Sequence, residues 1–259
     1  MKAKEIYEYL LSHAIGRMEP TCDGLIAGDE RKEVKKLGTC FKLTADLIAQ
    51  AKADGIDMMI THEPTFSRGD DPNYFTDIDR KKWDMLIDSD IALYRFHDHA
   101  HHTSPDYIHE GFIRSCGFDI MQRYERESLG VSRYELDGTL TVRDIARLIG
   151  ERLSIDFVRI VGDKDIPVKV MCLGLGSVGH DQIQYLFDPG CDLFITGEVG
   201  EVCTCEYVRD ACFLGEKKAV ILLGHFGAEY AGMRYLAEVL DRDLIPTCYF
   251  HSKEVYEGF

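Results

Sequence analysis

Residues 55–64 read GIDMMITHEP, and this stretch decides how the rest of the chain is interpreted. Its apolar centre is typical of a buried strand, and the proline at its end stops the strand. His62 and Glu63 stand where the strand ends. Because α/β proteins place their chemistry at the C-terminal ends of strands, these two side chains are the first candidates for a functional site.

A second stretch repeats this pattern later in the chain. Residues 190–198 read GCDLFITGE and match the first stretch at Gly, Asp, Ile, Thr and Glu. Each stretch follows a strand-like segment (34–37 or 168–171) and a helical segment, and each precedes a largely apolar run that ends in a histidine (91–97 or 220–225). The repetition predicts an internal duplication of a strand–helix–strand–helix–strand unit.

The duplication predicts an α/β fold of two similar lobes, residues 1–122 and residues 123–259. Elements at the ends of one lobe can also pack on the other, so the boundary near residue 123 can shift. Residues 65–79 form a polar loop beside the predicted site, of a kind that can cover it. Residues 140–149 are expected to form a helix, in which Thr141 is the N-cap and Asp144 completes a capping box.

Composition restricts the function classes. The chain has 259 residues, is 45% hydrophobic and carries a formal net charge of −15 with a pI near 5.1. This charge argues against nucleic acid or an anionic membrane as partner. No apolar run is long enough for a membrane span, and the N-terminal residues lack the apolar core of a signal peptide. Nine cysteines without a CxxC pair favour reduced thiols and a cytoplasmic protein.

The histidines supply the candidate site. Four of the ten lie in FHDHAHH, residues 96–102, where His97 and His101 are spaced to share one helical face. His225 and Glu229 have the same spacing. Any one of these histidines alone is more simply explained as a surface or hydrogen-bonded residue, but the set recurs at one place in a repeated unit. The candidate metal ligands are His62, Glu63, His97, His101, His225 and Glu229.

Imidazole and carboxylate donors without cysteine suit zinc, iron, manganese or nickel. Six donors exceed what one tetrahedral ion uses, so we expect two divalent metal ions that share a bridging carboxylate. Asp98, His99 and His102 are expected to orient the ligands by hydrogen bonds or to be exposed.

Residues 174–179 read GLGSVG and offer a competing interpretation. They match the GxGxxG pattern of dinucleotide-binding proteins between a predicted strand and a helical stretch, with Glu198 about 20 residues further on, where such folds hold the ribose. The alternative is a glycine-rich turn where the backbone approaches another group closely. The equivalent turn of the first copy has no such glycines, so a nucleotide-binding oxidoreductase is the less favoured hypothesis.

Taken together, five motifs resemble a known family: Asp23-Gly24-Leu25 with Gly28, Thr61-His62 with Pro64, the His97 region, residues 195–198, and Gly224-His225 with Glu229. The chain is similar over nearly its whole length to the Nif-three-like dinuclear metal centre proteins, often labelled GTP cyclohydrolase I type 2 homologues. The resemblance implies two α/β/α lobes with mixed sheets, a dinuclear site between them and a ring-shaped homohexamer. It also implies metal ligands at His62, Glu63, His101, His225 and Glu229, with His97 close by and Glu229 bridging the ions.

Two positions depart from the family pattern. The family usually has His-His-Pro where this chain has His62-Glu63-Pro64, and a carboxylate where this chain has His101. Together the changes exchange one imidazole and one carboxylate, which keeps the number of donors and their charge. We therefore expect metal binding to be retained. That residues 63 and 101 face each other across the site is a hypothesis.

These observations predict a metal-dependent hydrolase that acts on a small-molecule substrate, such as a nucleotide or cyclic amide, through a metal-activated water. Only the family label points to cyclohydrolase activity, since a fold does not fix a reaction. The alternative is a non-catalytic hexamer that stores, delivers or senses metal.

Overall fold

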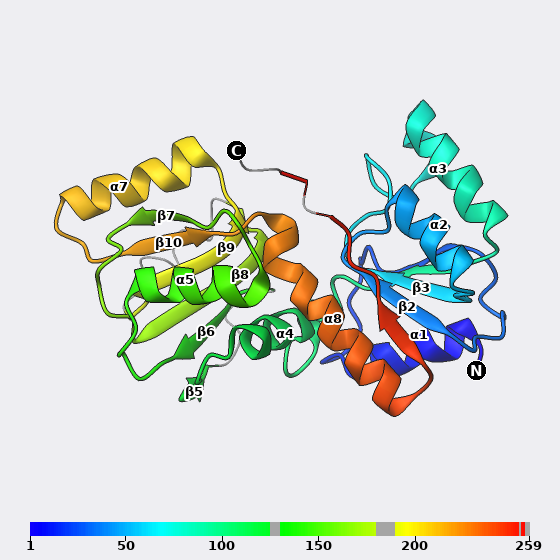
Figure 1. The fold of residues 1–259 in the computed structure, drawn as a ribbon, viewed down its shortest axis with the longest axis horizontal. Helices are drawn as coiled ribbons and strands as arrows, with labels where there is room; N and C mark the ends of the chain where they lie inside the picture. Colours follow the sequence, from blue (N-terminus) through cyan, green and yellow to red (C-terminus); the bar gives the residue numbers. More distant parts are fainter. Residues whose placement is uncertain (125–129, 180–189, 254, 257–259) are drawn as a thin grey trace. The chain divides into compact units, whose positions relative to one another are not determined.

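The computed structural model describes residues 1–124, 130–179, 190–253 and 255–256 (Figure 1). The helical stretch that was expected after the GLGSVG motif lies outside these residues. None of the helices in the described parts of the chain is long and apolar enough to cross a membrane.

The chain forms two compact units. The first contains Met1–Gly111 and Gly232–Lys253, and the second is built on Phe112–Ala231. These limits differ from the expected lobes of residues 1–122 and 123–259. The difference arises because the last strand of the chain pairs with a strand of the first unit, which returns the C-terminal segment to it.

The first unit is organised around a five-stranded mixed sheet with the order β1-β4-β3-β2-β11. Four of its strands are parallel to their neighbours, and only β1 at one edge runs antiparallel, to β4. The strands are β1 (Gly24–Ala27), β2 (Leu37–Cys40), β3 (Met58–Thr61), β4 (Ala92–Arg95) and β11 (Thr247–Tyr249).

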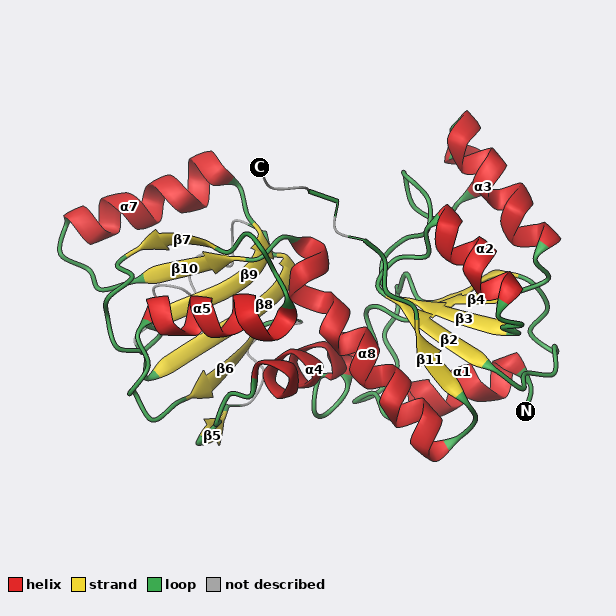
Figure 2. Cartoon of the chain, viewed as in Figure 1, coloured by secondary structure: helices red, strands yellow, loops and turns green. Residues whose placement is uncertain are grey.

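Helices cover both faces of this sheet, as Figure 2 shows. On one face, Met59 of β3 shares a core with Leu47 and Leu86. On the other face, the Thr39 hydroxyl donates to the Met233 carbonyl oxygen at 2.8 Å. With both faces buried, β3 is apolar throughout, which explains the continuous apolar run in the sequence. The helices are α2 (Ala45–Ala53) and α3 (Asp77–Asp88) on the first face and α1 (Ala3–Ser12) and the end of α8 (His225–Asp243) on the second.

Short elements join these helices and strands. The polar loop expected at residues 65–79 contains a 3-10 turn, Pro72–Tyr74, and is shorter than expected, because its last three residues already belong to α3. A second 3-10 turn, Ala100–His102, follows β4 and leads to α4 (Tyr107–Cys116).

The second unit contains a six-stranded mixed sheet with the order β5-β6-β8-β9-β10-β7. Strands β8, β9 and β10 are parallel, and the remaining pairs are antiparallel. The sheet consists of β5 (Gln122–Arg123), β6 (Ser132–Glu135), β7 (Arg159–Gly162), β8 (Val170–Ser177), β9 (Leu193–Glu198) and β10 (Ala219–Leu222).

The predicted helix start at Thr141 is confirmed in α5 (Val142–Leu153). The Thr141 hydroxyl accepts from the Asp144 amide at 3.2 Å and donates to the Asp144 carboxylate at 2.7 Å. This reciprocal capping box satisfies amides that the first helical turn leaves without partners. A π-helical turn, Glu201–Cys205, precedes α7 (Glu206–Phe213), whose Val208 packs with Phe194 on one face of the second sheet.

The predicted fold class is therefore confirmed as a mixed α/β fold with two mixed sheets. In both sheets, three parallel strands stand in the order β2-β3-β4 or β8-β9-β10, and an antiparallel strand flanks the last of them. The C-terminal ends of the parallel strands carry the residues considered next.

Candidate metal site

His62 follows the last residue of β3 and is completely buried. Its Nδ1 lies 3.1 Å from the carbonyl oxygen of Phe96. A carbonyl oxygen can only accept, so this nitrogen carries the proton and Nε2 keeps its lone pair. The backbone around His62 is fixed in turn by Arg95, whose Nε donates to the His62 carbonyl at 3.1 Å.

His97 and His101 follow β4, the neighbouring parallel strand. The His101 amide donates to the His97 carbonyl at 3.2 Å, so the chain makes one helical turn there and the predicted i, i+4 relation holds. The two ring centroids lie 5.5 Å apart, and His101 is buried while His97 is partly exposed.

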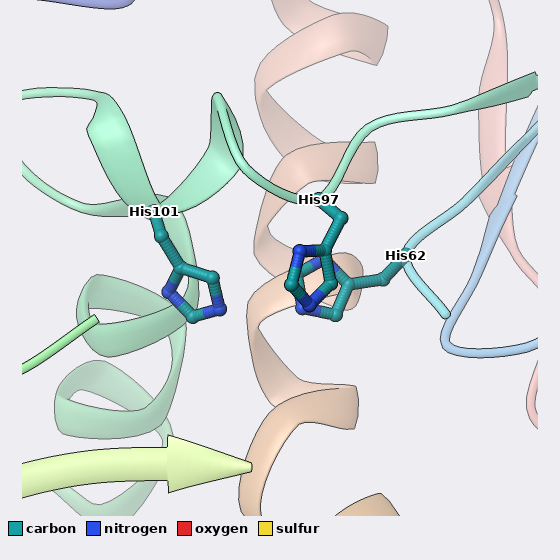
Figure 3. Close-up of side chains that lie close together, drawn as sticks. All are labelled: His62, His97 and His101. Carbon is teal, nitrogen blue, oxygen red and sulfur yellow. The ribbon is translucent and has the colours of Figure 1, made fainter. Parts of the chain in front are cut away.

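The three imidazoles gather at one place (Figure 3). The His62 and His97 rings are stacked with centroids 4.5 Å apart, and the His101 ring stands edge-on to His62 at 5.1 Å. One ring nitrogen from each histidine lies within 4.8 Å of those of the other two. This spacing is suited to one ion at the common point between them, since zinc–nitrogen bonds are about 2.0–2.1 Å long.

Each of these histidines is oriented by an oxygen atom at Nδ1. For His97 the partner is Asp98 Oδ1 at 2.9 Å, and for His101 it is Asp106 Oδ2 at 3.2 Å. Asp106 is fixed in turn at the start of α4, where its other oxygen accepts from the amides of residues 108 and 109 at 2.9 and 3.1 Å. Such outer partners set the tautomer and the ring orientation of metal-binding histidines.

Carboxylates make the surroundings of His97 strongly attractive to a cation. Burial alone would lower the pKa of His97, but hydrogen bonds with Asp98, Cys22 and Glu63 outweigh it and raise the pKa to about 12. His97 Nε2 lies 3.4 Å from Glu63 Oε1. The bond to His97 is also the main reason why the pKa of Asp98 lies well below its usual range. A metal ion and a proton would compete for the same nitrogen.

Asp23, from the first of the five family-like motifs, organises the histidine loop. Its Oδ1 accepts from the amides of His97 and Asp98 at 2.6 and 3.1 Å, and its Oδ2 accepts from the His99 amide at 2.8 Å. The His99 ring also bonds to Asp23, at 2.7 Å, and accepts from the Met18 amide at 3.1 Å. Asp23 and His99 therefore position the loop that carries His97 and His101.

The second unit contains a smaller cluster. His225 opens α8 directly after the β10 strand and its short turn, and Glu229 follows one helical turn later. His225 Nε2 lies 3.3 Å from Glu229 Oε2, while its Nδ1 is 2.8 Å from Oε1 of Glu198, the last residue of β9. His225 is thus oriented in the same way as the histidines of the first unit.

Glycines make room for this second cluster. Gly176 has a φ of +87°, and a Cβ there would clash with Glu229 Oε1 and lie 3.2 Å from His225 Nε2. The β8–β9 register shifts between Gly174 and Ser177, at the same point. A Cβ at Gly197 would lie 3.0 Å from the Cα of His225. The GLGSVG motif therefore continues β8 and approaches metal-type side chains with its second glycine.

The structure brings His62, His97 and His101 together with Glu63 in the first unit, and His225 with Glu229 in the second. Sequence reasoning did not single out Asp106 or assign an orienting role to Glu198. Asp106 had a usable signal, because it directly precedes α4 and Asp is a favoured N-cap.

A separate cavity of about 540 Å³ lies in the second unit between β7 and α7. It is lined by Ile160, Val161, Gly162, Asp163, Cys205, Glu206, Arg209 and Cys212, and so it shares no residue with either histidine cluster.

The fold and the site define a two-sheet α/β protein whose strand ends carry histidine and carboxylate clusters able to hold a metal ion. The chain belongs to the Duf34/NIF3 (NGG1p interacting factor 3) family, whose model matches residues 1–253. The resemblance seen in the sequence is thereby confirmed.

Relatives labelled GTP cyclohydrolase 1 type 2 homologue match this chain over different lengths. The GTP cyclohydrolase 1 type 2 homologue of Clostridium perfringens is 28% identical over 246 residues, which are 91% of this chain and 89% of the relative. The corresponding homologue of Methanocaldococcus jannaschii is 37% identical over 100 residues, or 38% of this chain and 40% of the relative.

Solved structures show the same fold. Staphylococcus aureus protein SA1388 has a TM-score of 0.81 at 18% identity, with 100% of this chain and 99% of that chain covered. Reduced HcgD from Methanocaldococcus jannaschii has a TM-score of 0.76 at 21% identity, with coverages of 96% and 97%.

Proposed function

We propose that this protein binds two divalent metal ions and uses them as a metal-dependent hydrolase on a small-molecule substrate. The proposal includes the two lobes as products of an internal duplication and the metal site as lying between them. The ligands we propose are His62, Glu63, His97 and His101 from the first unit and His225 and Glu229 from the second.

The observation that carries this proposal is the common orientation of the imidazoles. His62, His97 and His101 each have Nδ1 at an oxygen atom, and one ring nitrogen of each lies within 4.8 Å of those of the other two. Three oriented imidazoles with ring nitrogens this close together form a donor set that a shared cation would stabilise. The donor set of nitrogens and carboxylate oxygens fits zinc, iron, manganese or nickel.

The second cluster supports a two-ion site. His97 follows β4 and His225 follows β10, and each of these strands is the last of three parallel strands beside an antiparallel one. This agreement in topology favours the duplication. The GxGxxG alternative loses support, because Gly174 and Gly176 lie within β8 and the second approaches Glu229.

Bound divalent ions would supply a water of lowered pKa and would polarise the bond to be cleaved. The residues of the chain would hold that chemistry in place: Asp98 and Asp106 orient the ligand rings, and Glu63 lies beside His97 as a carboxylate donor. Exchange of Glu63 and His101 relative to the family pattern leaves this donor set intact.

Elemental analysis of the purified protein tests metal binding, with about two ions per chain expected. A His62→Ala variant should lose metal, whereas His102→Ala should keep it, because the partly exposed His102 ring bonds to the Ile15 carbonyl oxygen at 2.9 Å. Anomalous scattering from crystals grown without added metal would identify the ions and their ligands. Metal retained at wild-type level in His62→Ala would refute the proposed site.

Activity distinguishes a hydrolase from a metal store or sensor. We would assay a panel of nucleotides, phosphoesters and cyclic amides with the metal-loaded protein and with Glu229→Ala. Hydrolysis that disappears with the metal supports the enzyme, and activity that survives in the metal-free variant excludes a metal-centred mechanism. Tight metal binding without turnover of any class would favour the non-catalytic alternative.

We also propose assembly into a homohexamer, on the basis of the family resemblance. Exposed apolar side chains at and beside α7 support burial in an interface: Val202, Phe213 and Leu214 are 82%, 90% and 80% exposed. Native mass spectrometry measures the subunit number directly, and a monomer at micromolar concentration would contradict the proposal.

A further inference from the structure

The first unit has a positively charged side chain, Arg95, whose Nε donates to the His62 carbonyl oxygen. We call Lys42, Lys82 and Arg95 the basic cluster. Lys42 follows β2, Arg95 ends β4, and Lys82 reaches in from α3. The concentration of cations is notable because the whole chain carries a net charge of −15.

Asp70, from the polar loop, is the carboxylate partner of Arg95. Arg95 Nη1 lies 3.8 Å from Asp70 Oδ2, and the two side chains are only 12% and 10% exposed. Burial raises the pKa of Asp70, and the charges of Arg95 and Lys42 act against this rise. Asp70 Oδ1 accepts from the Thr65 amide, and the Thr65 carbonyl accepts from Lys82, so Arg95 and Lys82 are linked through Asp70 and Thr65.

Lys82 is the most constrained member. Its Nζ donates to the Thr65 carbonyl at 2.6 Å and lies 5.4 Å from the centre of the Phe66 ring. Burial, followed by the charge of Lys42, lowers its pKa to about 8. Because burial disfavours the charged form of Lys82, a bound anion would stabilise its ammonium group.

A second carboxylate on the same helix as Lys82, that of Asp79, already accepts several hydrogen bonds. It accepts from the Ser67 amide and hydroxyl at 3.0 and 2.5 Å and from the Thr76 hydroxyl at 2.7 Å. By contrast, the Thr65 hydroxyl is 99% buried with its residue and has no hydrogen-bond partner in the described part of the chain. Thr65 is bound on both sides, since its amide donates to Asp70 at 2.8 Å and its carbonyl accepts from Lys82.

We propose that the basic cluster and the Thr65 hydroxyl bind the phosphate group of the substrate. The proposal rests on the proposed function and specifies its substrate class as a phosphorylated small molecule. Arg95 connects the two sites, since its Nε donates to the carbonyl of His62. A phosphate dianion matches several cations and a hydroxyl donor better than a carboxylate does, because it offers more oxygens and more charge.

Calorimetric titration with inorganic phosphate tests the proposal on the wild-type protein and three variants. Lys82→Gln and Lys42→Gln each remove one charge from the cluster, and we expect each to weaken phosphate binding about tenfold. Lys81→Gln is the matched control, because it removes the same charge from an exposed neighbouring position on α3 and should bind as the wild type does. Lys82→Arg keeps the charge and should largely restore binding.

Metal content is measured on the same samples to distinguish the two proposals. Full metal content with phosphate binding that is indifferent to both lysines would mean that phosphate sits on the metal, which overturns the basic-cluster proposal alone. Lysine-dependent phosphate binding in a protein without metal would refute the proposed function and leave the anion site standing. A wild type that binds phosphate no better than acetate would also overturn the proposal.

Discussion

Gly176→Ala is the sharpest perturbation of the second cluster. Gly176 has a φ of +87°, a backbone conformation that an L-residue adopts at a cost. Its added methyl group would clash with Oε1 of Glu229, whose side chain is 2% exposed. The displaced atom is at the end of a flexible side chain, so we expect the Glu229 side chain to rotate away from His225 while the backbone keeps its position.

The magnitude has two parts. The backbone conformation should cost about 1–2 kcal/mol in the free energy of unfolding. For a chain of this size this lowers the melting temperature by about 2–8 °C. Displacing Glu229 from the site should weaken metal binding by about 10–100-fold, as loss of a ligand's support typically does.

Gly179→Ala is the matched control from the same glycine motif. Gly179 has an ordinary φ, and a Cβ there would meet no heavy atom of the described residues within 4 Å. Melting curves and metal titrations of the two variants would be compared side by side. A Gly176→Ala protein with the metal affinity of Gly179→Ala would refute the argument that this glycine exists to accommodate Glu229. Equal loss of metal in both would instead indicate that the whole motif contacts a ligand.

Three further outcomes follow from the structure. Asp106→Asn should weaken metal binding about 10–100-fold, because His101 would lose the carboxylate that orients it; titration with zinc measures this. Asp79→Asn should lower the free energy of unfolding at neutral pH, and the gap to the wild type should narrow in acid. Hydrogen bonds from Ser67 and Thr76 lower the pKa of Asp79 in the folded state. The stability that the ionised carboxylate contributes is therefore present above the unfolded pKa near 3.8 and is lost as the pH falls through the lower folded pKa. Urea unfolding of both proteins at pH 7 and pH 3 tests the sign. Removal of metal by a chelator should lower the melting temperature, since an ion at 100 times its dissociation constant stabilises the folded state by about 2.7 kcal/mol; an unchanged melting temperature would argue against a bound ion.

Much of the fold could be predicted because its signals are local. The apolar run before His62 is enough to predict a strand that is buried on both faces. The Thr141 capping box can be recognised from four consecutive residues. The pairing of β11 with β2 has no such signal. It joins Thr247 to Leu37 across almost the entire chain, and a short strand of mixed polarity carries no mark of its partner.

The candidate site follows the same division. The candidate ligands could be chosen from the sequence because the spacing of histidines and carboxylates at strand ends is a sequence property, whereas several groups that orient them come from other parts of the chain. Glu198 and His225 are brought together only by the parallel pairing of β9 and β10. Asp23, 74 residues before His97, accepts from three successive amides of the histidine loop, and no local spacing in the sequence indicates this contact.

The carboxylates that orient the histidines are buried in the first unit and exposed in the second, and this difference bears on metal affinity. In the first unit, His101 is held by Asp106, and both side chains are nearly inaccessible, at 7% and 4%. In the second, His225 is held by Glu198, which is 55% exposed. Salt screens exposed charge pairs much more than buried ones, and an exposed side chain also loses more conformational freedom when it is fixed. The His225–Glu198 pair should therefore weaken first as ionic strength rises, so that an ion depending on His225 would be released before one depending on the three imidazoles of the first unit.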